Sequence, residues 1–307
     1  MKIANNIMEL VGNTPLVRLN TASKLSGATI LGKCEFMNPT GSVKDRIGLN
    51  MIKKGLQDGL ITENTVIIEP TSGNTGVALA ANCAAQNLQL ILTMPESMSI
   101  ERRKLLKAFG AKLVLTPASE GMTGAINKAK LLKQEIQNSI ILQQFENKSN
   151  PEIHEITTAK EIIHDTDCKI DAFVAAVGTG GTLSGTSKTL KKECVGIKIF
   201  AVEPYSSAVL SGESSGTHKI QGIGAGFIPE ILNISCYDEV IKVTDKDAIE
   251  TAKMLAKKEG LLVGISAGAN VYASMQIAKR VEFQGKTIVT VLCDTGERYL
   301  STELFDE

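Results

Sequence analysis

Lys44 is the residue of this sequence best placed for covalent chemistry. It follows Asn38-Pro39-Thr40-Gly41-Ser42-Val43, whose proline and glycine predict a turn. Apolar residues then recur at roughly helical spacing, at Val43, Ile47, Met51 and Leu56. Lys44 is therefore expected in the first turn of a helix, where the helix dipole disfavours a cation and favours the neutral amine that attacks aldehydes. This stretch alone also fits a solvated surface lysine.

Two other stretches predict sites for anions. Each passes from a strand into a Gly/Thr/Ser turn and then into a helix, which places free N–H groups, hydroxyls and a helix N-terminus together. The turns are Thr71-Ser72-Gly73-Asn74-Thr75-Gly76 and Gly178-Thr179-Gly180-Gly181-Thr182. Either one alone also fits a tight turn with capping hydroxyls. One turn in each half of the chain predicts a ligand with two anionic ends, lying between domains.

Known phosphate motifs fit the second turn only in part. The P-loop motif requires a lysine that is absent here. The dinucleotide fingerprint is nearly met, but Leu183 stands at its third glycine, while Glu203 imitates the ribose-binding acid. An NAD-dependent oxidoreductase is therefore an alternative, although it gives Lys44 no task.

An aldehyde that carries a phosphate accounts for more of these residues. The turn from Gly178 to Thr182 would bind the phosphate, and Lys44 would form the Schiff base. The turn at Thr71 would bind a substrate carboxylate, and Ser266, which opens a further helix, would face the ring. Spacing alone does not show that these stretches meet.

Composition excludes several functional classes. The chain has 307 residues with 33 basic and 33 acidic side chains, so no general attraction to nucleic acid or an anionic membrane is expected. This length predicts about two domains. No stretch has the apolar length of a membrane span, and the N-terminus lacks the apolar region of a signal peptide.

Cysteine and histidine placement predicts neither disulfides nor a metal site. The cysteines form no CxxC pair, which is typical of reduced, mostly buried thiols in a cytoplasmic protein. They are Cys34, Cys83, Cys168, Cys194, Cys236 and Cys293. His154, His164 and His218 form no zinc-binding pattern.

Apolar runs alternate with helical patterns along most of the chain, which predicts an α/β fold with parallel sheets covered on both faces. The runs predict strands at 28–35, 65–69, 89–94, 111–115, 140–143, 172–177, 197–202, 239–243 and 287–292. A polar stretch at 146–151 marks a candidate domain boundary.

The whole chain also resembles a known family. The motifs in chain order are GNTPLVRL (from Gly12), NPTGSVKDRIG (from Asn38), EPTSGNTG (from Glu69), TMPESMSIERRKLLKAFGA (from Thr93), QQFENKSNPEIHE (from Gln143), GTGGT (from Gly178), HKIQGIGAGFIP (from His218), GISAG (from Gly264) and GERYLST (from Gly296). On these motifs the chain resembles the cysteine synthase (O-acetylserine sulfhydrylase) family of tryptophan-synthase-like, fold-type-II pyridoxal phosphate enzymes.

The resemblance implies a role for each matching position. The residues implied to bind pyridoxal 5'-phosphate are Lys44 as Schiff base, Asn74 at the ring hydroxyl oxygen, Ser266 at the pyridine nitrogen, and Gly178, Thr179, Gly180, Gly181 and Thr182 around the phosphate. The residues implied to bind the substrate are Thr71, Ser72, Gly73, Thr75 and Gln144 at the α-carboxylate, and Gly222 near the amino side.

The resemblance further implies the architecture and the activity. Two three-layer α/β domains would hold the cofactor in the cleft between them. The smaller would comprise residues 36–147, and the larger residues 1–35 and 148–307. The implied reaction is a β-replacement that forms L-cysteine from O-acetylserine and sulfide and releases acetate, with Lys44 as catalytic base.

Two departures from the family pattern leave the substrate open. The family often has Pro-Ser where this chain has Cys293-Asp294 before its last motif, and the Ser266-Ala267-Gly268 run also occurs in cystathionine β-synthases. Condensation of serine or O-acetylserine with homocysteine is therefore an alternative. A non-catalytic peptide-binding protein is another, because the family binds the C-terminal tail of serine acetyltransferase, although Lys44 argues against it. The resemblance implies a homodimer.

Overall fold

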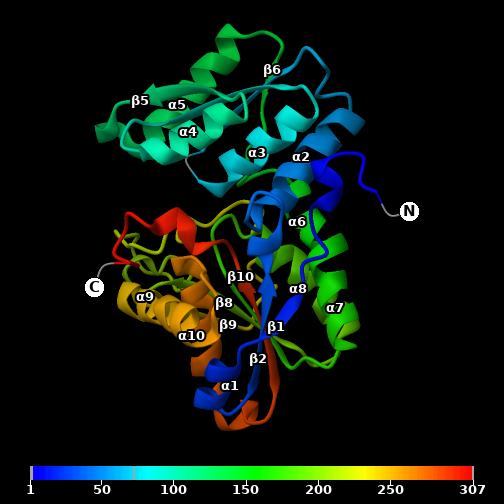
Figure 1. Ribbon diagram of the computed structural model, residues 1–307, viewed down its shortest axis with the longest axis vertical. Helices are drawn as coiled ribbons and strands as arrows, with labels where there is room; N and C mark the ends of the chain where they lie inside the picture. Colours follow the sequence, from blue (N-terminus) through cyan, green and yellow to red (C-terminus); the bar gives the residue numbers. More distant parts are fainter. Residues whose placement is uncertain (1–2, 72, 306–307) are drawn as a thin grey trace. The chain divides into compact units, whose positions relative to one another are not determined.

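The computed structural model describes residues 3–71 and 73–305, which form two compact units (Figure 1). Unit 1 comprises the described residues of Met1–Val11 and of Lys44–Ser149. Unit 2 comprises Gly12–Val43 and the described residues of Asn150–Glu307. The later division, between Ser149 and Asn150, falls inside the polar stretch at 146–151.

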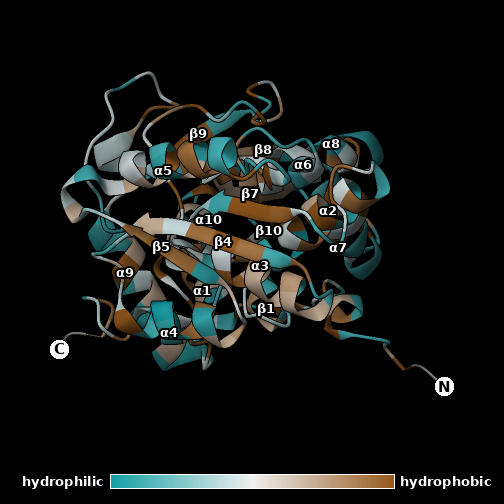
Figure 2. Ribbon diagram, turned by 90° about the horizontal axis from the view of Figure 1, so that it is seen from above, coloured by the Kyte–Doolittle hydropathy of each residue, from teal (hydrophilic) through white to brown (hydrophobic). Residues whose placement is uncertain are grey.

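Unit 1 is built on a four-stranded parallel sheet in the order β5-β4-β3-β6. Its strands are β3 (Val66–Pro70), β4 (Gln89–Pro95), β5 (Lys112–Thr116) and β6 (Ser139–Ile141), and its helices are α2 (Lys44–Gln57), α3 (Asn74–Ala85), α4 (Ile100–Ala108) and α5 (Gly121–Glu135). Ile91 of β4 packs with Ala129 of α5. The next residue, Leu92, lies beside Gly76 of α3 and Leu106 of α4, so helices cover both faces (Figure 2).

Unit 2 is built on a six-stranded sheet in the order β1-β2-β10-β7-β8-β9, in which only β1 runs antiparallel. Its strands are β1 (Leu16–Arg18), β2 (Thr29–Cys34), β7 (Ala172–Ala176), β8 (Lys198–Pro204), β9 (Glu239–Val243) and β10 (Thr287–Leu292). Its helices are α1 (Asn20–Ser26), α7 (Ala159–Thr166), α8 (Gly181–Glu193), α9 (Asp245–Met254) and α10 (Ile265–Ala278), while α6 (Ser149–Ile153) begins at the division.

Alternate residues of the central strands face two separate cores of unit 2. Ile288 belongs to the core that includes Ala248 of α9 and Ala269 of α10. The next residue, Val289, belongs to the core that includes Leu190 of α8. Because helices cover both faces, these strands are largely apolar: β7 is apolar throughout, and β10 carries only threonines among its apolar residues. The α/β class with mostly parallel sheets is confirmed.

The limits of the units differ from the expected domains early in the chain. Residues 3–11 belong to unit 1, although we expect them in the larger domain, and residues 36–43 belong to unit 2, although we expect them in the smaller one. The helix η1 (Ile7–Leu10) packs against α3, which explains the first difference. The backbone N–H of Val43 bonds to the Cys293 carbonyl oxygen at 2.8 Å, which explains the second.

Each strand expected from the apolar runs is present, and β9 and β10 have the expected limits. The edge strand β1 is absent from the expectation because three residues show no periodicity. Leu56 was expected on the apolar face of α2 but is exposed. It lies about 140° around the helix from Met51, and Gly55 occupies the buried position instead.

The expectation that all cysteines are free thiols is wrong for one pair. Cys168 and Cys194 form a disulfide, with their Cα atoms 5.4 Å apart. They lie just beyond the ends of α7 and α8, which pack against each other. A sequence separation of 26 residues carries no signal of this proximity. Cys34, Cys83 and Cys236 are buried free thiols, as expected.

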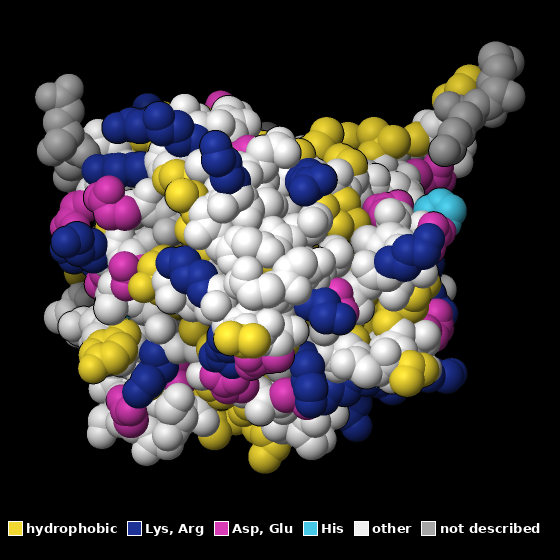
Figure 3. Space-filling model, turned by 90° about the horizontal axis from the view of Figure 1, so that it is seen from below, with side chains coloured by type: hydrophobic (Ala, Val, Ile, Leu, Met, Phe, Trp, Pro, Cys, Tyr) yellow, Lys and Arg dark blue, Asp and Glu magenta, His cyan; other side chains and the backbone are white. Residues whose placement is uncertain are grey.

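The surface mixes charges of both signs, in line with the zero net charge (Figure 3). None of the helices in the described part of the chain combines the length and the apolar character that a membrane crossing requires. Among residues 3–71 and 73–305, no three His, Cys, Asp or Glu side chains gather as a metal site would need.

Candidate active site

Lys44 is the first residue of α2, as the spacing predicts. Its side chain is half-buried, and the helix continues with the buried residues Ile47 and Met51 on its apolar face. The chain enters this helix directly from Val43, which bonds to the residue that follows β10. Lys44 is thus the residue at which the chain passes from unit 2 into unit 1.

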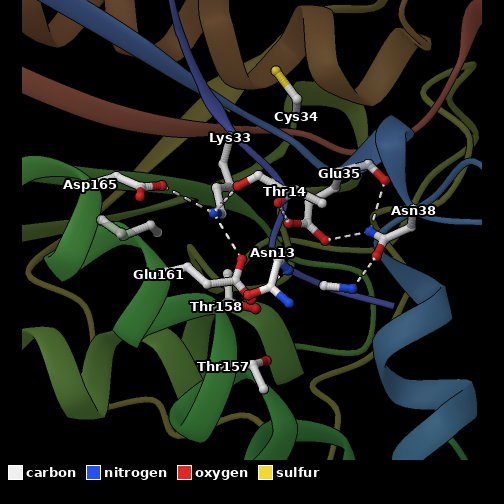
Figure 4. Close-up of polar contacts among 12 residues, drawn as sticks. Asn13, Thr14, Lys33, Cys34, Glu35, Asn38, Thr157, Thr158, Glu161 and Asp165 are labelled. Atoms are coloured by element: carbon white, nitrogen blue, oxygen red, sulfur yellow. Dashed lines mark hydrogen bonds and ion pairs between the residues drawn. The ribbon is translucent and has the colours of Figure 1, made fainter. Parts of the chain in front are cut away.

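The segment before Lys44 is held by a buried polar network in unit 2 (Figure 4). Asn38 accepts from the backbone N–H of Gly12 at 2.8 Å and donates to the Glu35 carboxylate at 2.8 Å. The other Glu35 oxygen accepts from the Thr14 hydroxyl at 2.7 Å. Glu35 and Asn38 are both buried, so this turn is held in one conformation as it leads to the helix of Lys44.

Lys33 extends this network to α7 (Figure 4). Its side chain is fully buried, and its ammonium group lies 2.8 Å from Glu161 and 3.6 Å from Asp165. It also donates to the carbonyl oxygen of Thr14. A buried ammonium group requires such partners, because desolvation disfavours an unpaired charge. No pattern in the sequence predicts this role for Lys33.

The threonine turn of unit 1, defined as residues 71–76, presents hydroxyl and amide groups at the start of α3. Thr71 and Thr75 are buried, and Asn74 is the first residue of the helix. The Thr75 hydroxyl donates to the side-chain oxygen of Gln144 at 2.7 Å. The structure therefore brings Thr71, Asn74, Thr75 and Gln144 into one region of unit 1. Ser72, also expected here, lies outside the described residues.

The glycine turn of unit 2, defined as residues 178–182, leads from β7 into α8 and is shaped by missing side chains. Gly180 has a left-handed backbone, with φ of 84°, and the backbone N–H of Gly181 at the start of α8 donates to the Thr179 hydroxyl at 3.5 Å. A Cβ atom on Gly178 would overlap the carbonyl oxygen of Gly222, and one on Gly181 would overlap the Asn150 side chain. The Asn150 amide in turn donates to the Thr179 hydroxyl at 3.0 Å.

Gly222 and Ser266 lie at the same edge of the sheet as the glycine turn. Gly222 contacts the turn, as its overlap with a Cβ on Gly178 shows. Ser266 is buried in the first turn of α10. The preceding Gly264 bonds through its N–H to the Asp294 carbonyl oxygen at 3.1 Å, next to the end of β10. Carboxyl ends of parallel strands are where α/β folds bind ligands.

These residues fit a phosphate-bearing cofactor. Backbone N–H groups at the start of α8 form a helix N-terminus, and an anion satisfies such groups. The glycines allow the turn to pack closely against Gly222 and Asn150, which fixes where these N–H groups lie. In unit 1, Lys44 offers an amine and the threonine turn offers hydroxyls, which are the donors that an aldehyde and a carboxylate require.

Comparison with known proteins decides between the possible cofactors. The sequence profile of the family described as pyridoxal-phosphate dependent enzyme matches residues 7–294. The chain belongs to this family. The group that fits the turns is therefore pyridoxal 5'-phosphate.

The relatives of this pyridoxal-phosphate dependent enzyme are close. A cysteine synthase of Staphylococcus aureus is 54% identical over 305 residues, which cover 99% of this chain and 98% of the relative. The crystal structure of a cysteine synthase from Entamoeba histolytica matches with a TM-score of 0.96 at 44% identity, over 100% of this chain and 93% of that one. An O-acetylserine dependent cystathionine beta-synthase from Helicobacter pylori matches with a TM-score of 0.91 at 38% identity, over 100% of both chains.

The alternative of an NAD-binding site finds no support at Glu203. This buried carboxylate accepts from the backbone N–H groups of Leu210 and Ser211 at 2.7 and 3.1 Å, and from the Ser211 hydroxyl at 2.6 Å. Its oxygens are thus engaged by the following loop rather than available to a ribose. Glu203 therefore has a structural role, and only its position in the sequence resembles that of a ribose-binding acid.

The buried thiols are not candidate nucleophiles. Burial raises the pKa of Cys34 to about 11 and that of Cys83 to about 12. The thiolate is the reactive form, so both thiols are inert at neutral pH.

Sequence reasoning missed two side chains that shape the turns. Asn150 supports the glycine turn, and Glu69 binds the segment that carries Gln144. Both lie in motifs that the sequence analysis quotes without giving these residues a task. The available signal is a polar residue among apolar neighbours, such as the acid that follows Ile67 and Ile68 near the end of β3.

Proposed function

We propose that this enzyme is a cysteine synthase, which forms L-cysteine from O-acetyl-L-serine and sulfide and releases acetate. The 54% identity to the Staphylococcus aureus cysteine synthase, over 99% of this chain, carries the proposal. The site supports it, since a lysine at a helix start and two turns suited to anions match a phosphate-bearing aldehyde and an amino-acid carboxylate.

The cofactor-binding residues are assigned by resemblance to the family. Bound pyridoxal phosphate would supply an electron sink that stabilises negative charge at the α-carbon of the substrate. Lys44 would bind its aldehyde, Asn74 would donate to the ring hydroxyl oxygen, and Ser266 would meet the pyridine nitrogen. The phosphate would be bound by Gly178, Thr179, Gly180, Gly181 and Thr182.

The substrate-binding residues surround the threonine turn. The α-carboxylate is bound by Thr71, Ser72, Gly73, Thr75 and Gln144, and Gly222 lies near the amino side. Lys44 takes the α-proton and later returns a proton to the product, so its amine must be neutral when the proton is taken. Thr75 and Gln144 orient the substrate because each already holds the other by a hydrogen bond of 2.7 Å.

Ser266 suits elimination of a leaving group from the β-carbon. A carboxylate at this position would keep the pyridine nitrogen protonated, whereas a hydroxyl stabilises that charge less. Negative charge at the α-carbon is then less dispersed, which favours loss of acetate over competing reactions at that carbon.

Cystathionine β-synthase activity is the second candidate. The match to the Helicobacter pylori enzyme over the whole chain favours it, as does the Ser266-Ala267-Gly268 run. Parallel assays with sulfide and with homocysteine, each with O-acetylserine or serine, separate the two activities. A higher kcat/KM with homocysteine would replace the first proposal by the second.

The remaining assignments concern assembly and location. We propose a homodimer, the commonest form of symmetric oligomer, and a cytoplasmic enzyme. Three buried free thiols support this location, whereas the Cys168–Cys194 disulfide argues against a reducing compartment. A further proposed partner is the C-terminal tail of serine acetyltransferase, whose terminal carboxylate would suit the same donors as the substrate carboxylate.

Borohydride reduction tests the covalent role of Lys44. Reduction should attach the cofactor to Lys44 in the wild type, as peptide mass spectrometry would show. Lys44→Ala should lose turnover by several orders of magnitude and bind the cofactor only non-covalently. The matched control is Lys53→Ala, an exposed lysine of the same helix, which should behave as wild type. Normal turnover in Lys44→Ala would end the proposal.

A further inference from the structure

Glu69 is a buried acid for which the proposed reaction has no task. It is the penultimate residue of β3, and only 1% of its surface is exposed. A buried carboxylate is costly unless its oxygens are hydrogen-bonded. One oxygen accepts from the backbone N–H of Gln143 at 2.9 Å, and the other accepts from that of Gln144 at 3.1 Å.

The position of Glu69 in the sheet explains these bonds. Strands β3 and β6 pair in parallel, and their last paired residues are Ile68 and Ile141. Glu69 follows directly on one strand, and the segment 142–144 follows on the other. The carboxylate of Glu69 therefore binds N–H groups just beyond the end of the backbone ladder, those of Gln143 and Gln144.

The segment that Glu69 holds has an unfavourable backbone. Gln143 has φ of 63°, in the left-handed region, which costs a residue with a side chain about 1 kcal/mol. Its carbonyl oxygen accepts from the N–H groups of Glu146 and Asn147, at 2.9 and 2.8 Å, which closes a turn. The Asn147 amide adds a bond of 2.8 Å to the Leu142 carbonyl oxygen.

Gln144 connects this turn to the threonine turn. Its backbone N–H bonds to Glu69, while its side-chain oxygen accepts from the Thr75 hydroxyl at 2.7 Å. Both Gln144 and Thr75 are buried. A shift of the Gln144 backbone therefore moves its amide relative to the hydroxyl of Thr75.

We propose that Glu69 is a positioning residue for the carboxylate of the substrate. Through the backbone of Gln143 and Gln144 it sets where the Gln144 amide stands beside Thr75. This inference rests on the proposed function, because that function makes Gln144 and Thr75 ligands of an amino-acid carboxylate. Among the residues that the structure describes, the partners of Glu69 are backbone N–H groups.

Glu69→Gln tests the proposal with little change in volume. The new amide turns an N–H group toward a backbone N–H, so one of the two bonds is lost. Amide hydrogen exchange should show lower protection factors at Gln143 and Gln144. Calorimetry on the cofactor-loaded protein should show roughly tenfold weaker binding of L-cysteine, the proposed product. Cofactor affinity should stay at the wild-type value.

Glu203→Gln is the matched control in unit 2. Glu203 is also buried and also accepts two backbone N–H groups, from Leu210 and Ser211. This control should lower protection at residues 210 and 211 and leave protection at residues 143 and 144 unchanged. It should also leave L-cysteine binding close to the wild-type affinity, which separates positioning from the general effect of an amide in place of a buried carboxylate.

A pH titration of the wild type repeats the test without a variant. Burial raises the pKa of Glu69 to about 7. The negative charge of Glu146 also raises this pKa, whereas hydrogen bonds from the backbone N–H groups of Gln144, Gln143 and Leu142 lower it. Above this pH both carboxylate oxygens accept. As the pH falls through about 7, one oxygen gains a proton, and protection at Gln143 and Gln144 should fall.

The outcomes distinguish this inference from the proposed function. Unchanged protection at Gln143 and Gln144 in Glu69→Gln would overturn the positioning role, and so would lost protection with unchanged L-cysteine affinity. Wild-type protein that makes no cysteine from O-acetylserine and sulfide would instead overturn the proposed function.

Discussion

The threonine turn and the glycine turn, which we propose bind the two anionic groups, are held in place by different means. Both follow a parallel strand and begin a helix, α3 in unit 1 and α8 in unit 2. The threonine turn relies on side chains, since Thr75 bonds to Gln144 and the backbone of Gln144 bonds to Glu69. In the glycine turn, Gly178 and Gly181 lack side chains because the Gly222 carbonyl oxygen and the Asn150 side chain occupy that space.

The difference follows from the ligands assigned to the turns. A phosphate has several oxygens and suits a ring of backbone N–H groups, which requires glycine so that the chain can approach closely. A planar carboxylate has two oxygens and suits a few directed hydroxyl and amide donors. We therefore expect substitutions in the glycine turn to weaken ligand binding through steric overlap, and substitutions in the threonine turn to weaken it through lost hydrogen bonds.

The largest effect is expected at the glycine turn. Gly178→Ala places a methyl group on the backbone carbonyl of Gly222, and such overpacking costs about 1–3 kcal/mol. Equilibrium dialysis should show cofactor affinity lower by roughly tenfold to a hundredfold. The control is Gly185→Ala in α8, which overlaps the Pro151 carbonyl oxygen instead. If Gly185→Ala weakens cofactor binding as much as Gly178→Ala does, then the loss of affinity reflects general overpacking of unit 2 and not a specific role of the glycine turn.

A smaller and different effect is expected at the threonine turn. Thr75→Val keeps the shape but removes the donor to Gln144, so the KM for O-acetylserine should rise by roughly tenfold while cofactor affinity is unchanged. Thr93→Val is the control, because it removes another buried hydrogen bond of unit 1, to the Ala125 carbonyl oxygen at 2.8 Å. Loss of the cofactor in Thr75→Val would contradict the division of tasks.

The smallest effect is expected at Gly73. A Cβ atom there meets nothing within 4 Å, and φ of −107° is open to any residue. Gly73→Ala should change the KM for O-acetylserine by less than about twofold. A tenfold increase in this KM would contradict the prediction and would show that the bound substrate contacts the Gly73 backbone so closely that a methyl group does not fit.

Local patterns predict much of this fold. The nine apolar runs are all strands, and Lys44 begins α2 where the turn and the spacing place it. These features depend on residues that are near one another in the chain, which is what periodicity and helix-start signals report. The fold class and the kinds of residue in both turns follow from the same signals.

What could not be predicted depends on residues far apart in the chain. Glu69 meets Gln144 across 75 residues, and the Cys168–Cys194 disulfide spans 26. Buried Lys33 lies near Glu161 only because β2 and α7 pack in one unit. Residue spacing in the sequence does not predict such long-range contacts. The roles of the buried polar side chains Lys33 and Glu69, which lie in largely apolar strands, therefore could not be predicted.

The burial of Lys33 has a consequence for how the protein is made. Its counter-charges, Glu161 and Asp165, are synthesised well over a hundred residues later. All four strands of unit 1 lie between Lys33 and Glu161 in the sequence, and the last of them ends at Ile141. The sheet of unit 1 can therefore form on the ribosome while the ammonium group of Lys33 is still solvated. Strands β1 and β2 thus join the rest of unit 2 only after it has emerged, because β2 pairs with β10, so residues 12–43 complete their fold late although they are synthesised early.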